Sequence, residues 1–523
     1  MIKRIASKWY RTHPFLLASF PLLALLLHNL GHVAFRDVLI PALFIIGSTA
    51  LIFVILAFLY RSPDRALIPT SIIVILFFSY GWVFAFIENR IQLEIGRFVI
   101  GPNKVLFLLL AFLMLVSIIV FFRSKSRFEN LNKVLCVMSI ALVLTSVLQI
   151  AWHLREVREL DSKYSVEQGE NIGGEMKELS SRPDIYYIVL DEYAGHNTLN
   201  NLFSYDNKPF YGALEERGFY VAEESRSNYT QTFLSIASAL NMKYLDSVPE
   251  KIGKDSEDWT MIYNMVRDSK TVYELRKFGY KFFTFRSGYA PTNFIKKADM
   301  NYQSGILDEF FSTLLQRTML LPLVEQKIVD LGKRERILYA LEKTRDIPEY
   351  NEPTFTLIHL VSPHSPYVFG SDGQEVEGTD EKNIEGVWSD ARKSFYVGEV
   401  QYLNKEILKL VDDIISKSSE PPVIIVQGDH GSKSLGKWEG DDFARERLEI
   451  MNAYYIPSGT EQLYQTITPV NSFRVVLDQT ISSDYGLVED KSYFSTIEKP
   501  FDFSDVTEVL ASSSYRAVVE KEI

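Results

Sequence analysis

Long apolar runs fill the first 150 or so residues, whereas short apolar runs alternate with amphipathic stretches in the remainder of the chain. A bilayer core about 30 Å thick requires about 20 apolar residues in helical form. Five segments meet this requirement: 14–34, 38–60, 67–87, 104–122 and 133–153. The pattern therefore predicts an N-terminal α-helical membrane domain, residues 1–153, with five transmembrane helices.

Basic residues gather at alternate ends of these segments, which predicts how the chain crosses the membrane. The N-terminal tail and the loops 61–66 and 123–133 carry Lys and Arg, whereas the loop 88–103 has mixed charges. Because Lys and Arg concentrate in cytoplasmic loops, the N-terminus is expected inside. Five crossings then put residue 154 onward outside the cytoplasm, in a multi-pass protein of the cell (inner or plasma) membrane.

Several polar residues lie within or beside the predicted spans, and two interpretations of them are open. Polar groups at membrane depth often mark functional sites, which here suggests a lipid-headgroup site facing the external domain. The alternative is an ordinary position at helix ends, in the headgroup layer. The residues concerned are His28, Asn29, His32, Glu88 and Asn89.

Residues 154–182 are strongly polar, which predicts a juxtamembrane helix followed by a linker. From residue 183 the pattern alternates between buried strands and helices, and such alternation indicates an α/β domain with a mainly parallel central sheet over 183–523. The predicted strands are 185–190, 280–285, 355–360 and 423–427, and the predicted helices are 210–217, 271–278 and 395–416.

Charge and cysteine content restrict the function and the compartment. The formal net charge of −11 argues against a nucleic-acid partner, because binding phosphates needs basic surface. The only cysteine, Cys136, lies in an apolar run, so an intramolecular disulfide is impossible. The external domain must therefore be stabilised by its core.

Polar clusters directly follow three of the predicted strands. Asp191-Glu192 follows the strand 185–190. The segment from Ser362 to Tyr367, which contains His364, follows the strand 355–360. Gly428-Asp429-His430-Gly431 follows the strand 423–427. In parallel sheets, functional groups collect beyond the carboxyl ends of strands. Asp, Glu and His are also metal ligands, so the three clusters together predict a metal site.

A fourth segment, residues 228–241, reads as a loop that enters a short helix. A hydroxyl at a helix N-terminus meets free N–H groups and the positive end of the helix dipole, which favour an anion. Alone, the segment is equally well explained by an ordinary N-terminal cap.

The order and spacing of these motifs resemble the alkaline phosphatase/sulfatase superfamily across about 183–500, and the five-helix anchor resembles lipoteichoic acid synthases and phosphoethanolamine transferases acting on lipid A. Superposing the sulfatase pattern C-x-P-S-R-A-S puts Thr232 at the nucleophile and Ser235 and Ser238 on its serines. Leu234 and Ile236 replace the Pro and Arg. The resemblance implies an alkaline-phosphatase-like fold and a threonine nucleophile, with Thr230 as the alternative.

The resemblance also implies the ligands of one divalent metal ion, either Mn, Mg or Zn. They are Asp191, Asp429, His430 and the Thr232 oxygen. His364 is expected to stabilise phosphoryl oxygens or to protonate a leaving group.

Other polar residues are also expected near the predicted site. Arg286 and Arg447 are candidates for anion contacts, and both also fit surface positions. His359 lies inside its strand, which favours a core position, and His196 is expected at the rim. Glu192 could be a ligand or not, because sulfatases use an acidic pair here and the transferases use one acid.

The leading hypothesis is an enzyme that transfers phosphoethanolamine or phosphoglycerol from a membrane phospholipid to an envelope glycan or glycolipid, through a phospho-threonine intermediate. The alternatives are a sulfatase or phosphodiesterase-type hydrolase of an extracellular ester, and an inactive membrane-anchored binding module. Two departures leave donor and acceptor open: disulfides are impossible, and Ser432-Lys433-Ser434 follows Gly431 without the Glu of the Gly-Glu-Ser version.

Overall fold

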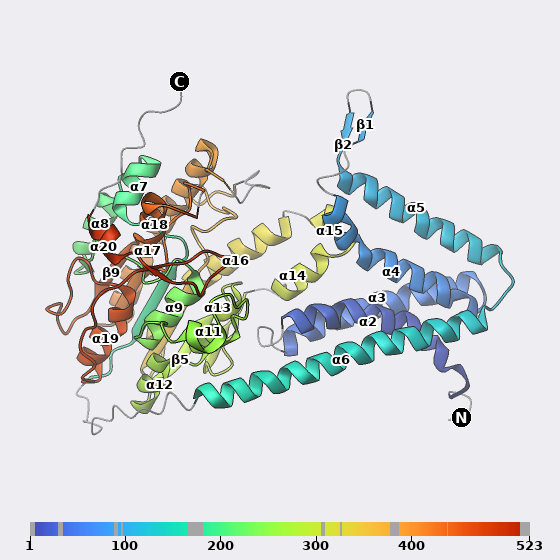
Figure 1. The fold of residues 1–523 in the computed structure, drawn as a ribbon, viewed down its shortest axis with the longest axis horizontal. Coiled ribbons are helices and arrows are strands. Elements are labelled where there is room, and N and C mark those ends of the chain that lie inside the picture. Colours follow the sequence, from blue (N-terminus) through green and yellow to red (C-terminus); the bar gives the residue numbers. More distant parts are fainter. Residues whose placement is uncertain are drawn as a thin grey trace. The chain divides into compact units, whose positions relative to one another are not determined.

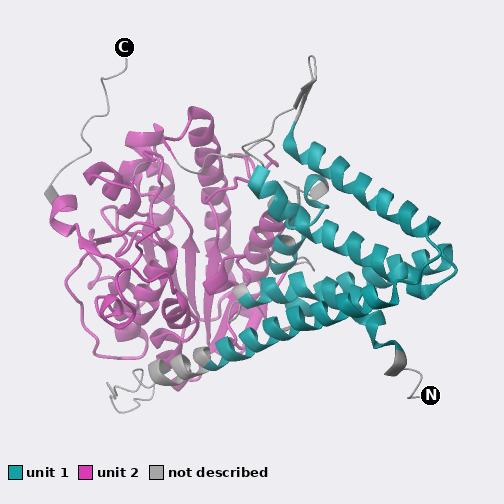
Figure 2. Cartoon of the chain, turned by 45° about the vertical axis from the view of Figure 1, so that its right-hand side comes forward, with its two compact units in different colours: residues 1–162, 306–329 teal, residues 163–305, 330–523 magenta. Residues whose placement is uncertain are grey.

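The computed structural model divides the chain into two compact units, which are described separately (Figure 2). The first comprises residues 1–162 and 306–329, and the second comprises 163–305 and 330–523. The residues described are 6–29, 35–87, 93–95, 98–165, 181–304, 309–324, 327–376, 386–436 and 438–512.

Five long helices of the first unit are apolar enough to cross a membrane, which confirms the five predicted spans. Their bounds are α2 (His13–His28), α3 (Phe35–Leu59), α4 (Pro63–Ile87), α5 (Pro102–Arg123) and α6 (Glu129–Ser165) (Figure 1). Many of their large apolar side chains point outward; Phe58, for example, is 86% exposed. Such exposure suits a lipid environment.

Of the predicted polar positions near the spans, only Asn29 has a described side chain. Its amide donates to the Leu25 carbonyl oxygen over 2.8 Å, so it ends α2 as a local cap. His32, Glu88, Asn89 and the His28 side chain lie outside the described residues. The predicted juxtamembrane helix is present as the last part of α6, and residues 166–180 also lie outside the described part.

Two short helices from the second half of the chain, α14 (Glu309–Gln316) and α15 (Leu321–Val324), belong to the first unit. The sequence of α14 spaces Phe310, Phe311, Leu314 and Leu315 on one helical face, and these pack into a cluster with residues of α2, α3 and α4. The sequence predicted one uninterrupted domain over 183–523 and did not indicate that residues 306–329 belong to the first unit.

The second unit contains a seven-stranded sheet of order β4-β9-β8-β3-β7-β5-β6. The strands are β3 (Ile185–Leu190), β4 (Tyr220–Val221), β5 (Lys281–Phe285), β6 (Met300–Tyr302), β7 (Thr354–Leu360), β8 (Val423–Gly428) and β9 (Asn452–Tyr455). Neighbouring strands from β8 to β6 are parallel, and β9 pairs antiparallel with β8 and β4. The predicted α/β class with a mainly parallel sheet is confirmed.

Helices cover both faces of this sheet, as Figure 1 shows. In β3, Ile185, Tyr187 and Val189 pack with α9 (Thr232–Asn241), α11 (Thr260–Arg267), α12 (Lys270–Lys277) and α19 (Pro469–Thr480). The alternate residues of β3 pack with α7 (His196–Phe203), α8 (Lys208–Glu215), α16 (Lys327–Thr344) and α17 (Asp390–Lys417). A strand buried on both faces explains why its sequence is continuously apolar.

Candidate active site and metal centre

Sheet register brings Asp191 and Asp429 together. Leu190 of β3 is paired with Gly428 of β8 in parallel, so the residue that follows each strand emerges at the same edge of the sheet. Leu190 is also paired with Leu360 of β7, and the Asp191 amide donates to the Leu360 carbonyl oxygen over 3.0 Å. Three strands distant in sequence therefore meet at the predicted site.

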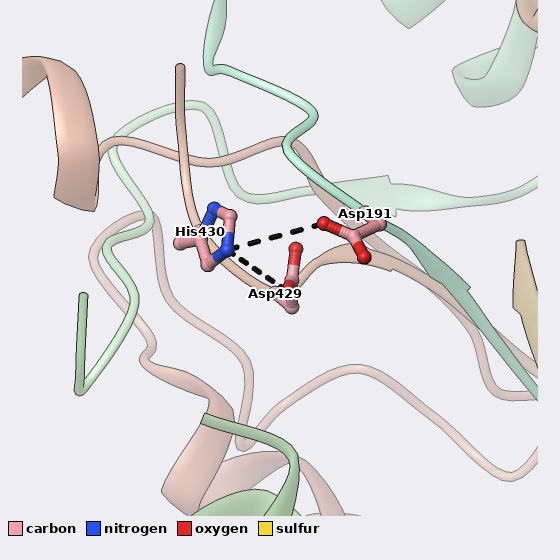
Figure 3. Close-up of side chains that lie close together, drawn as sticks. All are labelled: Asp191, Asp429 and His430. Atoms are coloured by element: carbon pink, nitrogen blue, oxygen red, sulfur yellow. Dashed lines mark ion pairs between the residues drawn. The ribbon is translucent and has the colours of Figure 1, made fainter. Parts of the chain in front are cut away.

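Asp191, Asp429 and His430 form a buried group at this edge (Figure 3). The Nε2 atom of His430 lies 3.3 Å from Oδ2 of Asp429 and 3.9 Å from Oδ1 of Asp191. One ligand atom from each residue lies within 4.8 Å of the others. This spacing suits side chains that surround one metal ion.

Two buried oxygens of this group have no hydrogen-bond partner among the described residues: Oδ1 of Asp191 and Oδ2 of Asp429. Burial raises the pKa of Asp191, and burial together with the Asp191 charge raises the pKa of Asp429 to about 7. Two close carboxylates repel each other when ionised. A divalent cation would offset that repulsion and bind both oxygens, so the residues present fit a metal ion.

The hydrogen bonds of His430 determine which ring nitrogen faces the carboxylates. Nδ1 lies 3.0 Å from the Gly431 carbonyl oxygen, which can only accept, so Nδ1 carries the proton. Burial, with the nearby Arg447 charge, lowers the pKa of His430, so the ring is neutral. Its Nε2 atom is therefore unprotonated, as in a metal-binding histidine.

Thr232 is the first residue of α9, and its Oγ1 lies 2.9 Å from Nε2 of His430. The residue is 8% exposed, and it stands at a helix start, where the N–H groups of the first turn have no partner within the helix. The Thr230 hydroxyl instead donates to the Ser495 carbonyl oxygen over 2.7 Å and is fully buried. Of the two threonines considered, Thr232 is the one that contacts the metal-ligand group.

The two serines that match the sulfatase pattern donate hydrogen bonds to backbone carbonyl oxygens around the site. Ser235 donates to the Tyr229 carbonyl oxygen and also contacts Ser227 Oγ, each over 2.8 Å. Ser227 in turn donates to the Asp429 carbonyl oxygen over 2.5 Å. Ser238 donates to the Lys243 carbonyl oxygen. The Ser227–Ser235 pair thus fixes the start of α9 against the Asp429 loop.

Glu192 lies beside the site with a buried carboxylate and a φ of +67°, an uncommon conformation for a non-glycine residue. Its oxygens lie 3.7 Å from His364 Nε2, 3.6 Å from Arg447 Nη1 and 4.0 Å from Lys433 Nζ. Burial opposes ionisation, but the surrounding positive charges prevail and lower the pKa of Glu192. Glu192 therefore organises a cationic group rather than joining the Asp191–Asp429–His430 group.

The structure places Arg447 beside His430. Arg447 is 4% exposed, and its Nη2 atom donates to His430 Nε2 over 2.9 Å and to the Thr230 carbonyl oxygen over 3.0 Å. Arg286 is also buried, and its guanidinium lies over the Phe294 ring. His196 packs against Tyr211, with its Nδ1 3.8 Å from Asp206, and the group of possible metal ligands does not include it.

Two residues at the site were missed by sequence reasoning. His359, expected in the core, is buried in β7, but its Nε2 lies 3.4 Å from Oδ2 of Asp191 and its Nδ1 lies 2.8 Å from Thr292 Oγ1. Tyr289 packs its ring edge against His359, and its hydroxyl interacts with Thr232. His359 pairs with Val189, one residue before the end of β3, which the register alone reveals.

No family model and no curated protein matches this sequence. Among solved structures, the C-terminal periplasmic domain of EcEptC from Escherichia coli matches with 14% identity, 63% of this chain, 94% of that chain and a TM-score of 0.42. The integral membrane protein lipooligosaccharide phosphoethanolamine transferase A from Neisseria meningitidis matches with 14% identity, 91% of this chain, 96% of that chain and a TM-score of 0.37.

The lipoteichoic acid synthase LtaP from Listeria monocytogenes matches with 13% identity, 66% of this chain, 81% of that chain and a TM-score of 0.39. A protein in the alkaline phosphatase superfamily from Vibrio parahaemolyticus is also similar, at 14% identity and a TM-score of 0.36. The solved structures to which the chain is similar thus include a phosphoethanolamine transferase, a lipoteichoic acid synthase and a protein in the alkaline phosphatase superfamily.

Proposed function

We propose that this protein is a metal-dependent transferase that moves a phospho-group from a membrane phospholipid to an envelope glycan or glycolipid. The group transferred is phosphoethanolamine or phosphoglycerol, and Thr232 carries it between the two substrates. The observation that supports this most is the hydroxyl of Thr232, 2.9 Å from His430 at the N-terminus of a helix, beside two carboxylate oxygens that lack partners among the described residues.

Asp191, Asp429, His430 and the Thr232 oxygen would hold the metal ion, with His359 as a further imidazole within reach. When bound, the ion lowers the pKa of the threonine hydroxyl and neutralises charge on the phosphoryl oxygens. The carboxylate-rich donor set suits Mn or Mg, and the imidazoles suit Zn.

The chain's own residues supply the remaining chemistry. Thr232 Oγ1 gives its proton to solvent and forms a bond to phosphorus, and the bond from phosphorus to the diacylglycerol oxygen breaks. The diacylglycerol oxygen takes a proton that Nε2 of His364 first accepts from solvent and then donates. The His364 Nδ1 proton is held by the Ser365 carbonyl oxygen over 2.6 Å, which leaves Nε2 to exchange a proton.

The second half of the reaction returns the enzyme to its starting state. The acceptor hydroxyl gives its proton to solvent and forms a bond to phosphorus. The bond from phosphorus to Thr232 Oγ1 breaks, and Thr232 Oγ1 takes a proton back from solvent. N–H groups at the start of α9 and the buried Arg447 guanidinium would stabilise the negative charge of the phospho-group in both steps.

Purified full-length protein in lipid nanodiscs tests this function. Phosphatidylethanolamine and phosphatidylglycerol, each radiolabelled in the glycerol backbone, are supplied with Mn, Mg or Zn. We expect metal-dependent release of diacylglycerol that is lost in Thr232→Ala. Intact-mass measurement should show the phospho-group on wild-type protein when acceptor is absent.

The alternatives give different results in the same assay. Turnover of a sulfate ester or of a soluble phosphodiester without release of diacylglycerol would instead indicate a hydrolase. A membrane-anchored binding module would turn over none of these substrates. An unchanged envelope glycan in a Thr232→Ala strain, measured by mass spectrometry, would contradict the proposed acceptor class.

The proposed location is the cell membrane, with residue 154 onward outside the cytoplasm. Cysteine labelling tests it, because Cys136 is buried and can be replaced by Ala without changing the reactive surface. In that background, Val387→Cys, at a position 70% exposed, should react with a membrane-impermeant maleimide on intact cells. Lys125→Cys, in the loop 123–133, should react only after the cells are lysed.

A further inference from the structure

A buried ion pair lies behind the loop that carries His364. Lys333 of α16 and Glu399 of α17 face each other with 3.6 Å between Nζ and Oε1, and their side chains are 5% and 0% exposed. Burial of two charges is costly unless both are paired and hydrogen-bonded. Neither residue is explained by the metal group or by the nucleophile, so a role for the pair has to be found in what it contacts.

Lys333 holds the middle of the His364 loop. Its ammonium donates to the carbonyl oxygens of His364 and Pro366, the latter over 2.7 Å. The carbonyl between these two belongs to Ser365, and it is the one that accepts the hydrogen bond from His364 Nδ1. Fixing the carbonyls on either side therefore fixes the group that orients the imidazole.

Glu399 holds both ends of the same loop. Its carboxylate accepts a hydrogen bond from the Ser362 hydroxyl and another from the Val368 amide, over 3.0 Å. A carboxylate that accepts such bonds is strongly attached to its partners. The loop 362–368 is thus fastened at its ends by Glu399 and at its centre by Lys333.

We propose that the buried Lys333–Glu399 ion pair positions His364 for its part in phosphoryl transfer, by fixing the backbone of the loop 362–368. Among the described residues, no hydrogen bond of the pair goes to Asp191, Asp429, His430 or Thr232. The pair acts through the Ser365 carbonyl oxygen and the Nδ1 atom of His364. The expected effect on kcat rests on the proposed function, whereas the expected effect on the backbone of the loop 362–368 does not.

The test removes both charges together. Lys333→Met alone leaves Glu399 buried without its counter-ion, so the double variant K333M/E399L is made in parallel, because apolar replacement of a whole buried pair is well tolerated. Lys343→Met is the matched control: it lies on the same helix, but its side chain is 39% exposed and pairs with Asp346. All variants are assayed as full-length protein in nanodiscs.

For K333M/E399L we expect kcat for diacylglycerol release to fall about 10- to 100-fold, because a misplaced catalytic group costs rate rather than binding. KM for the phospholipid and the affinity for Mn²⁺ should stay within about twofold of wild type. In a His364→Ala background the same pair of substitutions should cause no further loss, since the pair acts through His364.

A further loss of equal size in the His364→Ala background would overturn the proposal, because the pair would then act by another route. The structural part is tested without substrate, by deuterium exchange of the amides of 362–368. Exchange should be faster in K333M/E399L and unchanged in Lys343→Met. If wild type releases no diacylglycerol, the proposed function fails, and unchanged exchange in K333M/E399L would overturn the positioning role separately.

Discussion

The Nε2 atom of His359 lies 3.4 Å from Oδ2 of Asp191, although His359 is an interior residue of strand β7. Burial lowers the pKa of His359 to about 4, so the ring is neutral and its Nε2 can bind a cation. Thr292 contacts the other ring nitrogen over 2.8 Å and so fixes the ring. The site therefore has two imidazoles beside its two carboxylates.

His359→Ala should weaken metal binding. We expect a loss of affinity of about 10- to 100-fold, because loss of a ligand or of its oriented neighbour typically has that effect. Equilibrium dialysis with Zn²⁺ or Mn²⁺ on full-length protein measures it. His196→Ala is the control, since that ring packs against Tyr211 and the group of possible metal ligands does not include it. Equal affinities in wild type and His359→Ala would rule out a role for this imidazole.

Thr232→Ala should abolish diacylglycerol release, with a loss of at least about 10³-fold, as expected when a nucleophile is removed. Thr230→Ala should keep most of the activity but lower stability by about 1 kcal/mol, because it loses the hydrogen bond to Ser495. Rates with labelled phospholipid and thermal unfolding separate the two effects. A dead Thr230→Ala beside an active Thr232→Ala would exchange their roles.

Metal ions should stabilise the folded protein, because they bind the native group of Asp191, Asp429 and His430. An ion at 100 times its Kd adds about 2.7 kcal/mol to the free energy of unfolding. Thermal unfolding of wild type should therefore shift upward with added metal and downward with a chelator. Asp429→Asn should lose this response while still folding, and a full metal response in that variant would contradict the ligand assignment.

Gly81 of α4 lies against the backbone of residue 317. The Gly81 amide donates to the Arg317 carbonyl oxygen over 3.2 Å, the Met319 amide donates to the Phe77 carbonyl oxygen over 3.1 Å, and a Cβ on Gly81 would lie 2.6 Å from the Arg317 Cα. Gly81→Ala should therefore destabilise the protein by about 1–3 kcal/mol, as overpacking does. Thermal unfolding in detergent measures the change.

Gly47→Ala provides the matched control for this prediction. Gly47 is also in a long apolar helix, but an added Cβ there would meet no atom within 4 Å. Alanine is the better helix former, so this variant should be as stable as wild type or slightly more stable. Equal effects of the two substitutions would mean that residues 317–319 do not dock against α4 as described.

Local sequence pattern determined the elements of this protein. Runs of about 20 apolar residues predicted the five membrane helices, since a bilayer imposes that length on a helix. The continuous apolar run 185–190 predicted β3 with its observed bounds. The polar clusters after three strands, together with Thr232, predicted residues that the structure brings together, because parallel strands end at one edge of the sheet.

Only the tertiary structure decided features that depend on contacts between distant segments. The register between β3 and β7 makes His359 a neighbour of Asp191, whereas its place inside a strand had indicated the core. Thr230 and Thr232 differ in what their hydroxyls face, although they are two residues apart. The docking of residues 309–324 on the membrane helices, and the ion pair of Lys333 with Glu399, likewise join segments whose sequences carry no sign of each other.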